Sequence, residues 1–128
     1  MAIALDSSVL IALANIDDAH HGACTSKVIR KRYQYRASIL AYLKALYGGF
    51  RDSYEVAVVA SLDLLQRIDE VLDLNLRVAK RALEMIAESG FELADSVICA
   101  TAEIYGDELW TCDKGMVSKF PMARYIGA

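Results

Sequence analysis

The chain has 128 residues, of which 55% are hydrophobic and 24% are charged, and it contains a single proline. This length is typical of one domain with a sizeable core, and the composition argues against a disordered chain. The formal net charge of −3 gives no support to broad, nonspecific binding of nucleic acid. We therefore expect one globular domain over residues 1–128.

Neither a membrane helix nor a secretory signal is predicted. No apolar run reaches the roughly 18 residues that a membrane helix requires, and the N-terminal segment meets an acid at Asp6. Three widely spaced cysteines, Cys24, Cys99 and Cys112, indicate buried free thiols rather than a disulfide framework or a paired-cysteine metal site. These features predict a cytoplasmic protein.

Short apolar segments alternate with stretches of three-four apolar spacing, which predicts alternating strands and helices. The expected elements, in chain order, are a strand at 2–5, helices at 9–15 and 18–31, a strand at 33–38, helices at 39–47 and 52–67, a strand at 70–74, a helix from 76 to 89, a helix at 93–105, a strand at 108–112 and an edge strand at 123–126. Gly48 and Gly49 are expected to end the helix at 39–47, and Gly90 the helix that starts at 76. The pattern predicts an α/β fold with a mainly parallel central sheet flanked by helices on both faces.

Two aspartates directly follow predicted strands, and a third lies in the first turn of a helix. Asp6 ends the strand at 2–5, Asp113 follows the strand at 108–112, and Asp95 lies in the apolar segment 93–98. Each alone is also explained as a helix cap. Ligands of parallel sheets bind beyond the carboxyl ends of the strands, so we expect the three carboxylates to face one cleft.

Three carboxylates in one cleft repel one another, and a hard divalent cation such as Mg²⁺ or Mn²⁺ relieves that repulsion. A bound metal of this kind lowers the pKa of a water and neutralises charge that develops on phosphorus, which suits phosphodiester hydrolysis. The sequence has no GxxxxGK[ST], GxGxxG or HExxH motif, so it lacks the signatures of triphosphate, dinucleotide and zinc-protease sites. A divalent-metal site is the prediction that remains.

At these residues the sequence resembles the PIN domain family, in particular the VapC-type toxins of prokaryotic toxin–antitoxin pairs. The matching segments are LDSSVLI at 5–11, LADSVICATA at 93–102 and WTCDK at 110–114. The resemblance implies a PIN-like, Rossmann-like three-layer fold, metal-dependent cleavage of RNA, homodimers and inhibition by a cognate antitoxin. By matching position it makes Asp6, Asp95 and Asp113 metal-binding acids, and Ser8 and Thr111 hydroxyls that orient the carboxylates.

One position departs from the family pattern. The family usually places a glutamate in the helix after the second strand, in a pattern of a serine, five residues and the glutamate. Here Ser38 and five residues are followed by Lys44, the only charge in 39–50. Either Lys44 points into the cleft, where an ammonium pairs with the aspartates and competes with the metal, or it is an ordinary surface lysine. In the first case the activity is impaired, whether the lysine is natural or introduced.

Two surfaces are candidates for partners. The mean hydropathy of +0.27 is high for a small monomer, so apolar helices of the first half are expected to be covered by an antitoxin and by a second copy in a homodimer. A basic cluster is the local candidate for phosphate contacts with RNA, although favourable charge at a helix C-terminus explains it as well. Its members are Lys27, Arg30, Lys31, Arg32 and Arg36.

Two other functions are compatible with parts of this pattern. A catalytically inactive PIN-like domain that acts by binding RNA or protein is favoured by Lys44. A receiver-like or phosphatase-like domain would use Asp6, but Ser8 stands where such domains have a second acid, and the segments around Asp95 and Asp113 count against it.

Overall fold

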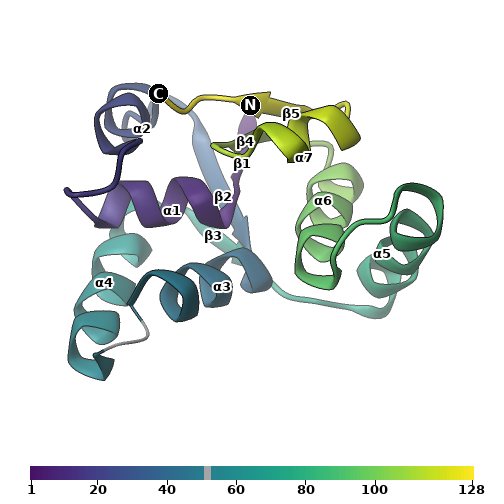
Figure 1. Cartoon of the computed structure of the whole chain (residues 1–128), viewed down its shortest axis with the longest axis horizontal. Helices are drawn as coiled ribbons and strands as arrows, with labels where there is room; N and C mark the ends of the chain where they lie inside the picture. Colours follow the sequence, from purple (N-terminus) through teal and green to yellow (C-terminus); the bar gives the residue numbers. More distant parts are fainter. Residues whose placement is uncertain (51–52) are drawn as a thin grey trace.

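The computed structural model describes residues 1–50 and 53–128, and its centre is a parallel sheet of five strands (Figure 1). The strands are β1 (Ala2–Leu5), β2 (Gln34–Ser38), β3 (Glu70–Leu72), β4 (Glu108–Thr111) and β5 (Ala123–Tyr125). They lie in the order β3-β2-β1-β4-β5, and all four neighbouring pairs are parallel. The predicted α/β fold with a parallel sheet is confirmed.

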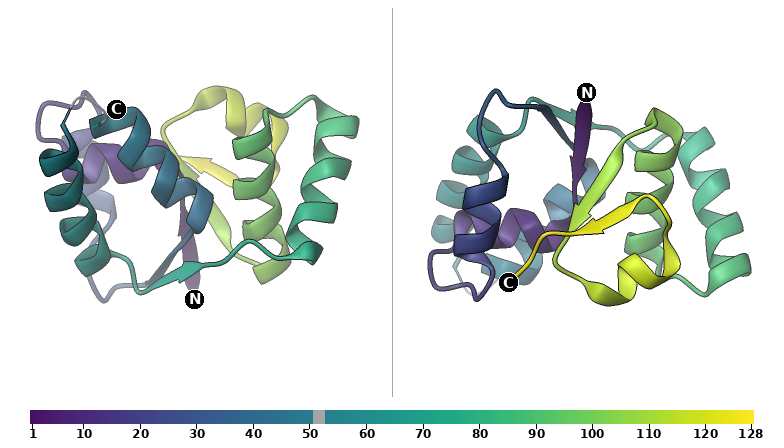
Figure 2. Two further views of the ribbon diagram at one scale, coloured as in Figure 1. Left: turned by 90° about the horizontal axis from the view of Figure 1, so that it is seen from below. Right: turned by 90° about the horizontal axis from the view of Figure 1, so that it is seen from above.

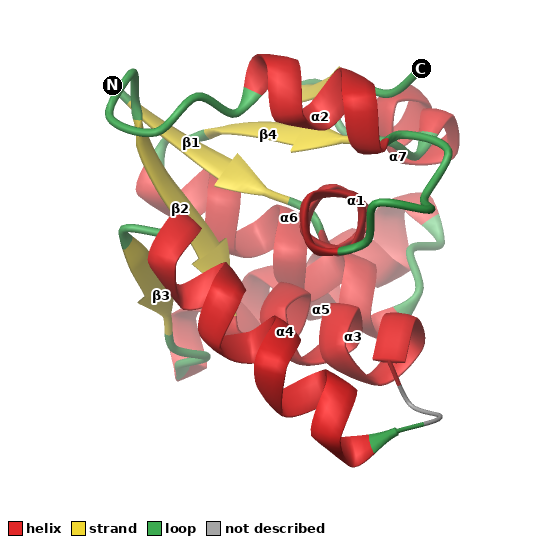
Figure 3. Ribbon diagram, turned by 90° about the vertical axis from the view of Figure 1, so that its left-hand side faces the viewer, coloured by secondary structure: helices red, strands yellow, loops and turns green. Residues whose placement is uncertain are grey.

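Helices cover both faces of this sheet. They are α1 (Ser7–Ala14), α2 (His21–Lys27), α3 (Ile39–Phe50), α4 (Tyr54–Arg67), α5 (Leu76–Ser89), α6 (Leu93–Tyr105) and α7 (Lys114–Lys119). Helices α1, α2 and α4 lie on one side and α5 and α6 on the other, as three directions of view show (Figures 2 and 3). Helix α3 contacts both α1 and α6.

The strand order reverses at β1, because the chain moves outward from β1 to β2 and β3 and then returns to β4 on its other side. In open α/β sheets the carboxyl ends of the strands at such a reversal form the ligand crevice. Asp6 and Asp113 follow β1 and β4, so the fold places both at this point. The buried Ile3, Leu5 and Leu109 anchor the two strands in the core.

Local signals explain where several helices begin and end. The side chains of Ser53 and Asn75 accept hydrogen bonds from the first turns of α4 and α5. Gly90 and Gly106, with φ of 67° and 71°, end α5 and α6 in the left-handed conformation that glycine adopts without strain. The expected ends at Gly90 and at residue 105 are confirmed.

Helix α2 is shorter than the predicted helix at 18–31. Asp18 accepts a hydrogen bond from the backbone N–H of His20, a local turn that competes with helix before His21. At the other end, Lys31 has a φ of 68°, which is incompatible with a continuing helix. The helix is therefore confined to the seven residues His21–Lys27.

The predicted end of α3 at Gly48 and Gly49 is wrong, because the helix continues to Phe50. The predicted start of the next helix at residue 52 lies outside the described residues. Helix α7 was not predicted; it begins directly after Asp113, whose side chain caps it.

Most of the large apolar side chains of α4 are exposed. Ala60 and Leu64 are the buried residues of the helix, whereas Tyr54, Leu62 and Leu65 are 83%, 58% and 49% exposed. Helix α4 packs on α3 and α1 with Ala60 and Leu64 buried, which leaves Tyr54, Leu62 and Leu65 outside. No helix within the described residues has both the length and the apolar character needed to cross a membrane.

Candidate active site

Asp6 lies at the carboxyl end of β1, where its backbone N–H donates to the carbonyl of Trp110 on β4 at 3.0 Å. Its side chain is only 3% exposed. Ser8 Oγ and Thr111 Oγ1 donate to its Oδ2 at 2.9 and 2.7 Å. Its Oδ1 is buried and has no hydrogen-bond partner among the described residues. A buried carboxylate oxygen without a donor is costly unless a ligand binds it, so Oδ1 is the atom that points to a cation.

Burial raises the pKa of Asp6, and hydrogen bonds from Thr111, Ser8 and the backbone of Ser7 oppose that rise without cancelling it. The negative charge of Asp95 adds to the increase. The two carboxylates therefore lie near enough to repel each other. This is the electrostatic condition that a positive ion at the site would relieve.

Ser8 and Thr111 connect Asp6 to the segment that follows β4. Ser8 Oγ accepts the backbone N–H of Cys112 at 2.9 Å, and Thr111 Oγ1 accepts that of Asp113 at 3.0 Å. Each hydroxyl thus accepts from the backbone and donates to the Asp6 carboxylate. This arrangement fixes the orientation of Asp6 relative to the start of α7.

Asp95 lies in the first turn of α6 and is paired with Lys44 of α3. Lys44 Nζ donates to Asp95 Oδ1 at 2.8 Å. Burial lowers the pKa of Lys44, but the hydrogen bond and charge of Asp95 and the charges of Asp6 and Glu92 outweigh it, so the pKa is raised. Lys44 is therefore an ammonium that lies among these acids.

Asp113 lies at the same edge of the sheet and is exposed. Its Oδ1 accepts the backbone N–H groups of Gly115 and Met116 at 2.8 and 3.4 Å, which makes it the N-cap of α7. One of its two carboxylate oxygens is thus engaged in capping. The other oxygen is the one that remains to bind a ligand.

Within residues 1–50 and 53–128 no three His, Cys, Asp or Glu side chains are grouped closely enough to hold a metal ion. The structure brings Asp6, Asp95 and Lys44 together, and it places Asp113 at the same edge with its side chain turned to α7. An all-oxygen donor set and the unpartnered Oδ1 of Asp6 fit a hard divalent cation. The ammonium of Lys44 opposes one, because it brings a positive charge to the site and engages one of the two oxygens of Asp95.

Sequence reasoning missed Glu92, whose charge contributes to the raised pKa of Lys44. It is the exposed N-cap residue of α6, three positions before Asp95. Residues three positions apart at a helix lie on the same face, so this spacing from Asp95 could have identified Glu92 from the sequence.

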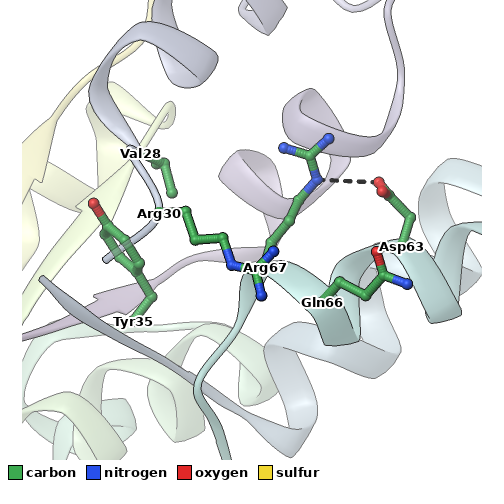
Figure 4. A pocket seen from close by; sticks show the side chains of 6 residues that line it. All are labelled: Val28, Arg30, Tyr35, Asp63, Gln66 and Arg67. Carbon is green, nitrogen blue, oxygen red and sulfur yellow. Dashed lines mark hydrogen bonds and ion pairs between the residues drawn. The ribbon is translucent and has the colours of Figure 1, made fainter. Parts of the chain in front are cut away.

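The predicted basic cluster is divided among different surroundings. Arg36 is bound by Asp107 through two hydrogen bonds and is not available for phosphate. Arg30 lines a cavity of about 250 Å³ beside Arg67, which pairs with Asp63 (Figure 4). Lys27 and Arg32 line a different hollow. The basic cluster as a phosphate contact stays a prediction for the four members other than Arg36.

A family model described as PIN domain matches residues 3–119. The chain belongs to the PIN domain family. The match covers all three acids and the lysine described above. No curated protein matches the chain.

Solved structures share this PIN fold. VapC20 of Mycobacterium tuberculosis, described as a sarcin–ricin loop cleaving toxin, has a TM-score of 0.79 and 20% identity over 91% of this chain and 93% of its own. A toxin–antitoxin complex from Klebsiella pneumoniae gives 0.76 and 18% over 95% of each chain. VapBC2 from Rickettsia felis, bound to a promoter DNA fragment, gives 0.76 and 16% over 98% of each. At these identities the likeness establishes the fold.

Proposed function

We propose that this PIN domain is a divalent-metal-dependent endoribonuclease, the toxin of a prokaryotic toxin–antitoxin pair, and that Lys44 impairs it. The observation that carries the proposal is the buried Asp6 Oδ1 without a hydrogen-bond partner among the described residues, at the strand reversal of a PIN fold. The similarity to VapC20, described as a sarcin–ricin loop cleaving toxin, supports the choice of RNA as the substrate class.

Asp6, Asp95 and Asp113 are the residues that would hold Mg²⁺ or Mn²⁺. When bound, such an ion activates a water and neutralises charge on the phosphate. The protein itself orients the carboxylate oxygens. The hydroxyls of Ser8 and Thr111 donate to Asp6 Oδ2, so Oδ1 is the oxygen that remains to bind the ion. The first turns of α6 and α7 carry the other two acids.

Lys44 acts against this arrangement. Its Nζ lies 2.8 Å from Asp95 Oδ1, so a metal at Asp95 either displaces a charge-assisted hydrogen bond or binds Oδ2 beside a positive charge. Glutamate at this position would remove the positive charge and supply a further oxygen donor, which a hard metal accepts. The local charge changes by two units.

Cleavage of a structured RNA in Mg²⁺ tests the proposal. Lys44→Glu should increase the cleavage rate about tenfold or more, which corresponds to roughly 1.4 kcal/mol of improved metal binding. The matched control is Lys80→Glu, the same charge reversal at an exposed lysine of α5, which should leave the rate unchanged. Adding Asp6→Asn to Lys44→Glu should abolish the gain. Equal rates for the protein and Lys44→Glu would refute the impairment by Lys44.

A second candidate function is that of a catalytically inactive PIN domain that binds RNA or protein. The Lys44–Asp95 pair favours this function, because the ammonium of Lys44 supplies the positive charge that a bound metal ion would otherwise supply to the acids. The Lys44→Glu variant distinguishes the two functions. In an impaired nuclease the substitution increases both metal binding and RNA cleavage, whereas in an inactive domain it increases metal binding alone.

An antitoxin is the proposed protein partner, and an apolar groove between α3 and α4 is the proposed place of its contact. Leu43 and Tyr47 of α3 and Tyr54 and Val58 of α4 line this groove and are exposed. An amphipathic segment of an antitoxin would bury these side chains. Leu43→Glu should therefore weaken binding of the cognate antitoxin at least tenfold, whereas Leu83→Glu on α5 should not.

A further inference from the structure

Two of the three cysteines are in contact although they lie 88 positions apart in the sequence. Cys24 Sγ on α2 is 3.3 Å from Cys112 Sγ, which directly follows β4. Both are free thiols, as is the buried Cys99 of α6. A disulfide has sulfurs roughly 2 Å apart, so bond formation requires the two sulfurs to approach by little more than an ångström.

The two thiols differ in access. Cys24 is fully buried at 0% exposure, whereas Cys112 is partly exposed. A small oxidant therefore reaches Cys112 first, and Cys24 is positioned behind it to complete the reaction. Cys99 is also fully buried, and among the described residues its sulfur does not contact the sulfur of Cys24 or Cys112.

We propose that Cys24 and Cys112 form a reversible oxidation site that reacts with hydroperoxides and closes as an intramolecular disulfide between α2 and the segment after β4. This inference rests on the sulfur contact and not on the proposed nuclease activity. It assigns distinct roles: Cys112 meets the oxidant, and Cys24 resolves the product.

The reaction balances in two steps. The Cys112 sulfur attacks the terminal oxygen of the hydroperoxide and the O–O bond breaks, so that the hydroxyl passes to sulfur and makes Cys112 a sulfenic acid. The other oxygen takes the Cys112 thiol proton and leaves as an alcohol (water for hydrogen peroxide). The Cys24 sulfur then attacks the Cys112 sulfur, the S–O bond breaks, and water leaves with the thiol proton of Cys24. Two thiols lose two electrons and the hydroperoxide gains them. A dithiol reductant reverses the disulfide by exchange.

The disulfide would lie next to the acids. Cys112 stands between Thr111 and Asp113, and its backbone N–H donates to Ser8 Oγ, which donates to Asp6. Oxidation therefore changes the segment on which the orientation of Asp6 depends. This connects the redox state of the thiol pair to the shape of the active-site edge.

Intact-mass measurement of the full chain tests the proposal. After reaction with hydrogen peroxide, then unfolding and alkylation, the chain should take up one alkyl group instead of three and should lose two hydrogen masses. Peptide mapping should find Cys24 linked to Cys112 within one chain, and dithiothreitol should restore three alkylations. Cys99→Ala is the matched control and should still form the bond.

Cys24→Ala should stop the reaction at the sulfenic acid of Cys112, which dimedone traps. Trapping at Cys112 is a positive result, so it tests the role of Cys24 separately from any effect of the substitution on folding. Three alkylated cysteines after oxidation, or a bond between two chains, would overturn the proposal. The readout needs neither metal nor RNA, so its failure and a failure of the nuclease proposal are independent results.

Discussion

The carboxylate of Asp6 is buried, and only one of its two oxygens accepts hydrogen bonds from the described residues. Thr111 and Ser8 donate to Oδ2, while Oδ1 has no donor among the described residues. A hydrogen bond to a charged group contributes more to stability than one to a neutral carbonyl, because the buried charge is costly without it. The hydroxyl of Thr111 is therefore a structural requirement of the site.

Thr111→Val should lower the free energy of unfolding by about 2 kcal/mol, since it leaves Asp6 with one donor fewer at nearly the same side-chain volume. The matched control is Thr101→Val, where a buried threonine hydroxyl donates to the neutral carbonyl of Val97 at 2.7 Å. That loss should be about 1 kcal/mol. Urea unfolding of both variants measures the difference, and an equal loss would show that the charge of Asp6 does not matter.

At the scale of elements, helix bounds were predicted correctly where the capping residues lie in the same segment of sequence. Helix α6 was expected at 93–105 and is observed at Leu93–Tyr105, because Gly106 ends it and small residues let it pack on the sheet. The buried face of α4 was not predictable, because it depends on what packs against the helix. The contact between Lys44 and Asp95 was predictable only as one of two alternatives, since a lone charge on a helix has no defined partner in the sequence.

The pair of Arg36 and Asp107 joins β2 to the turn before β4. Arg36 donates from Nε and Nη2 to the two oxygens of Asp107 at 3.0 and 2.7 Å, and the Asp107 side chain is 2% exposed. The hydrogen bond to Asp107 is the main cause that raises the pKa of Arg36. Removing the guanidinium leaves a buried carboxylate without its counter-charge.

Arg36→Met should therefore lower the free energy of unfolding by about 3 kcal/mol, as expected when one partner of a buried pair is removed. Arg67→Met is the control, because its pair with Asp63 is partly exposed and lies within one helix. That change should cost at most about 0.5 kcal/mol. Similar losses in urea unfolding would contradict the structural role of the Arg36 pair.

At the scale of the whole molecule, apolar side chains remain outside on α3 and α4. Leu43, Tyr47, Val59 and Leu62 are each more than half exposed. The sequence predicted that apolar helices of the first half would need a cover, and these exposed side chains lie on two of those helices.

We predict a homodimer for this reason. Light scattering at high micromolar concentration should give twice the 14.1 kDa mass of one chain. Exposed apolar surface is unfavourable in water, and a second copy is expected to cover the part that lies outside the groove proposed for the antitoxin, which includes Val59 and Leu62. A monomeric mass at that concentration would contradict the prediction.

The competition between Lys44 and a metal for the same acids is tested most directly by calorimetric titration of Mn²⁺ into the metal-free protein, Lys44→Glu and the control Lys80→Glu. Lys44→Glu should bind Mn²⁺ about tenfold more tightly or better, since the change removes a positive charge and adds an oxygen donor. Without metal its melting temperature should fall, and Mg²⁺ should restore it, because a ligand of the folded state stabilises that state. If Lys44→Glu binds Mn²⁺ no better than Lys80→Glu, then Lys44 does not compete for the metal, and the proposal that it impairs a metal site at Asp95 is contradicted.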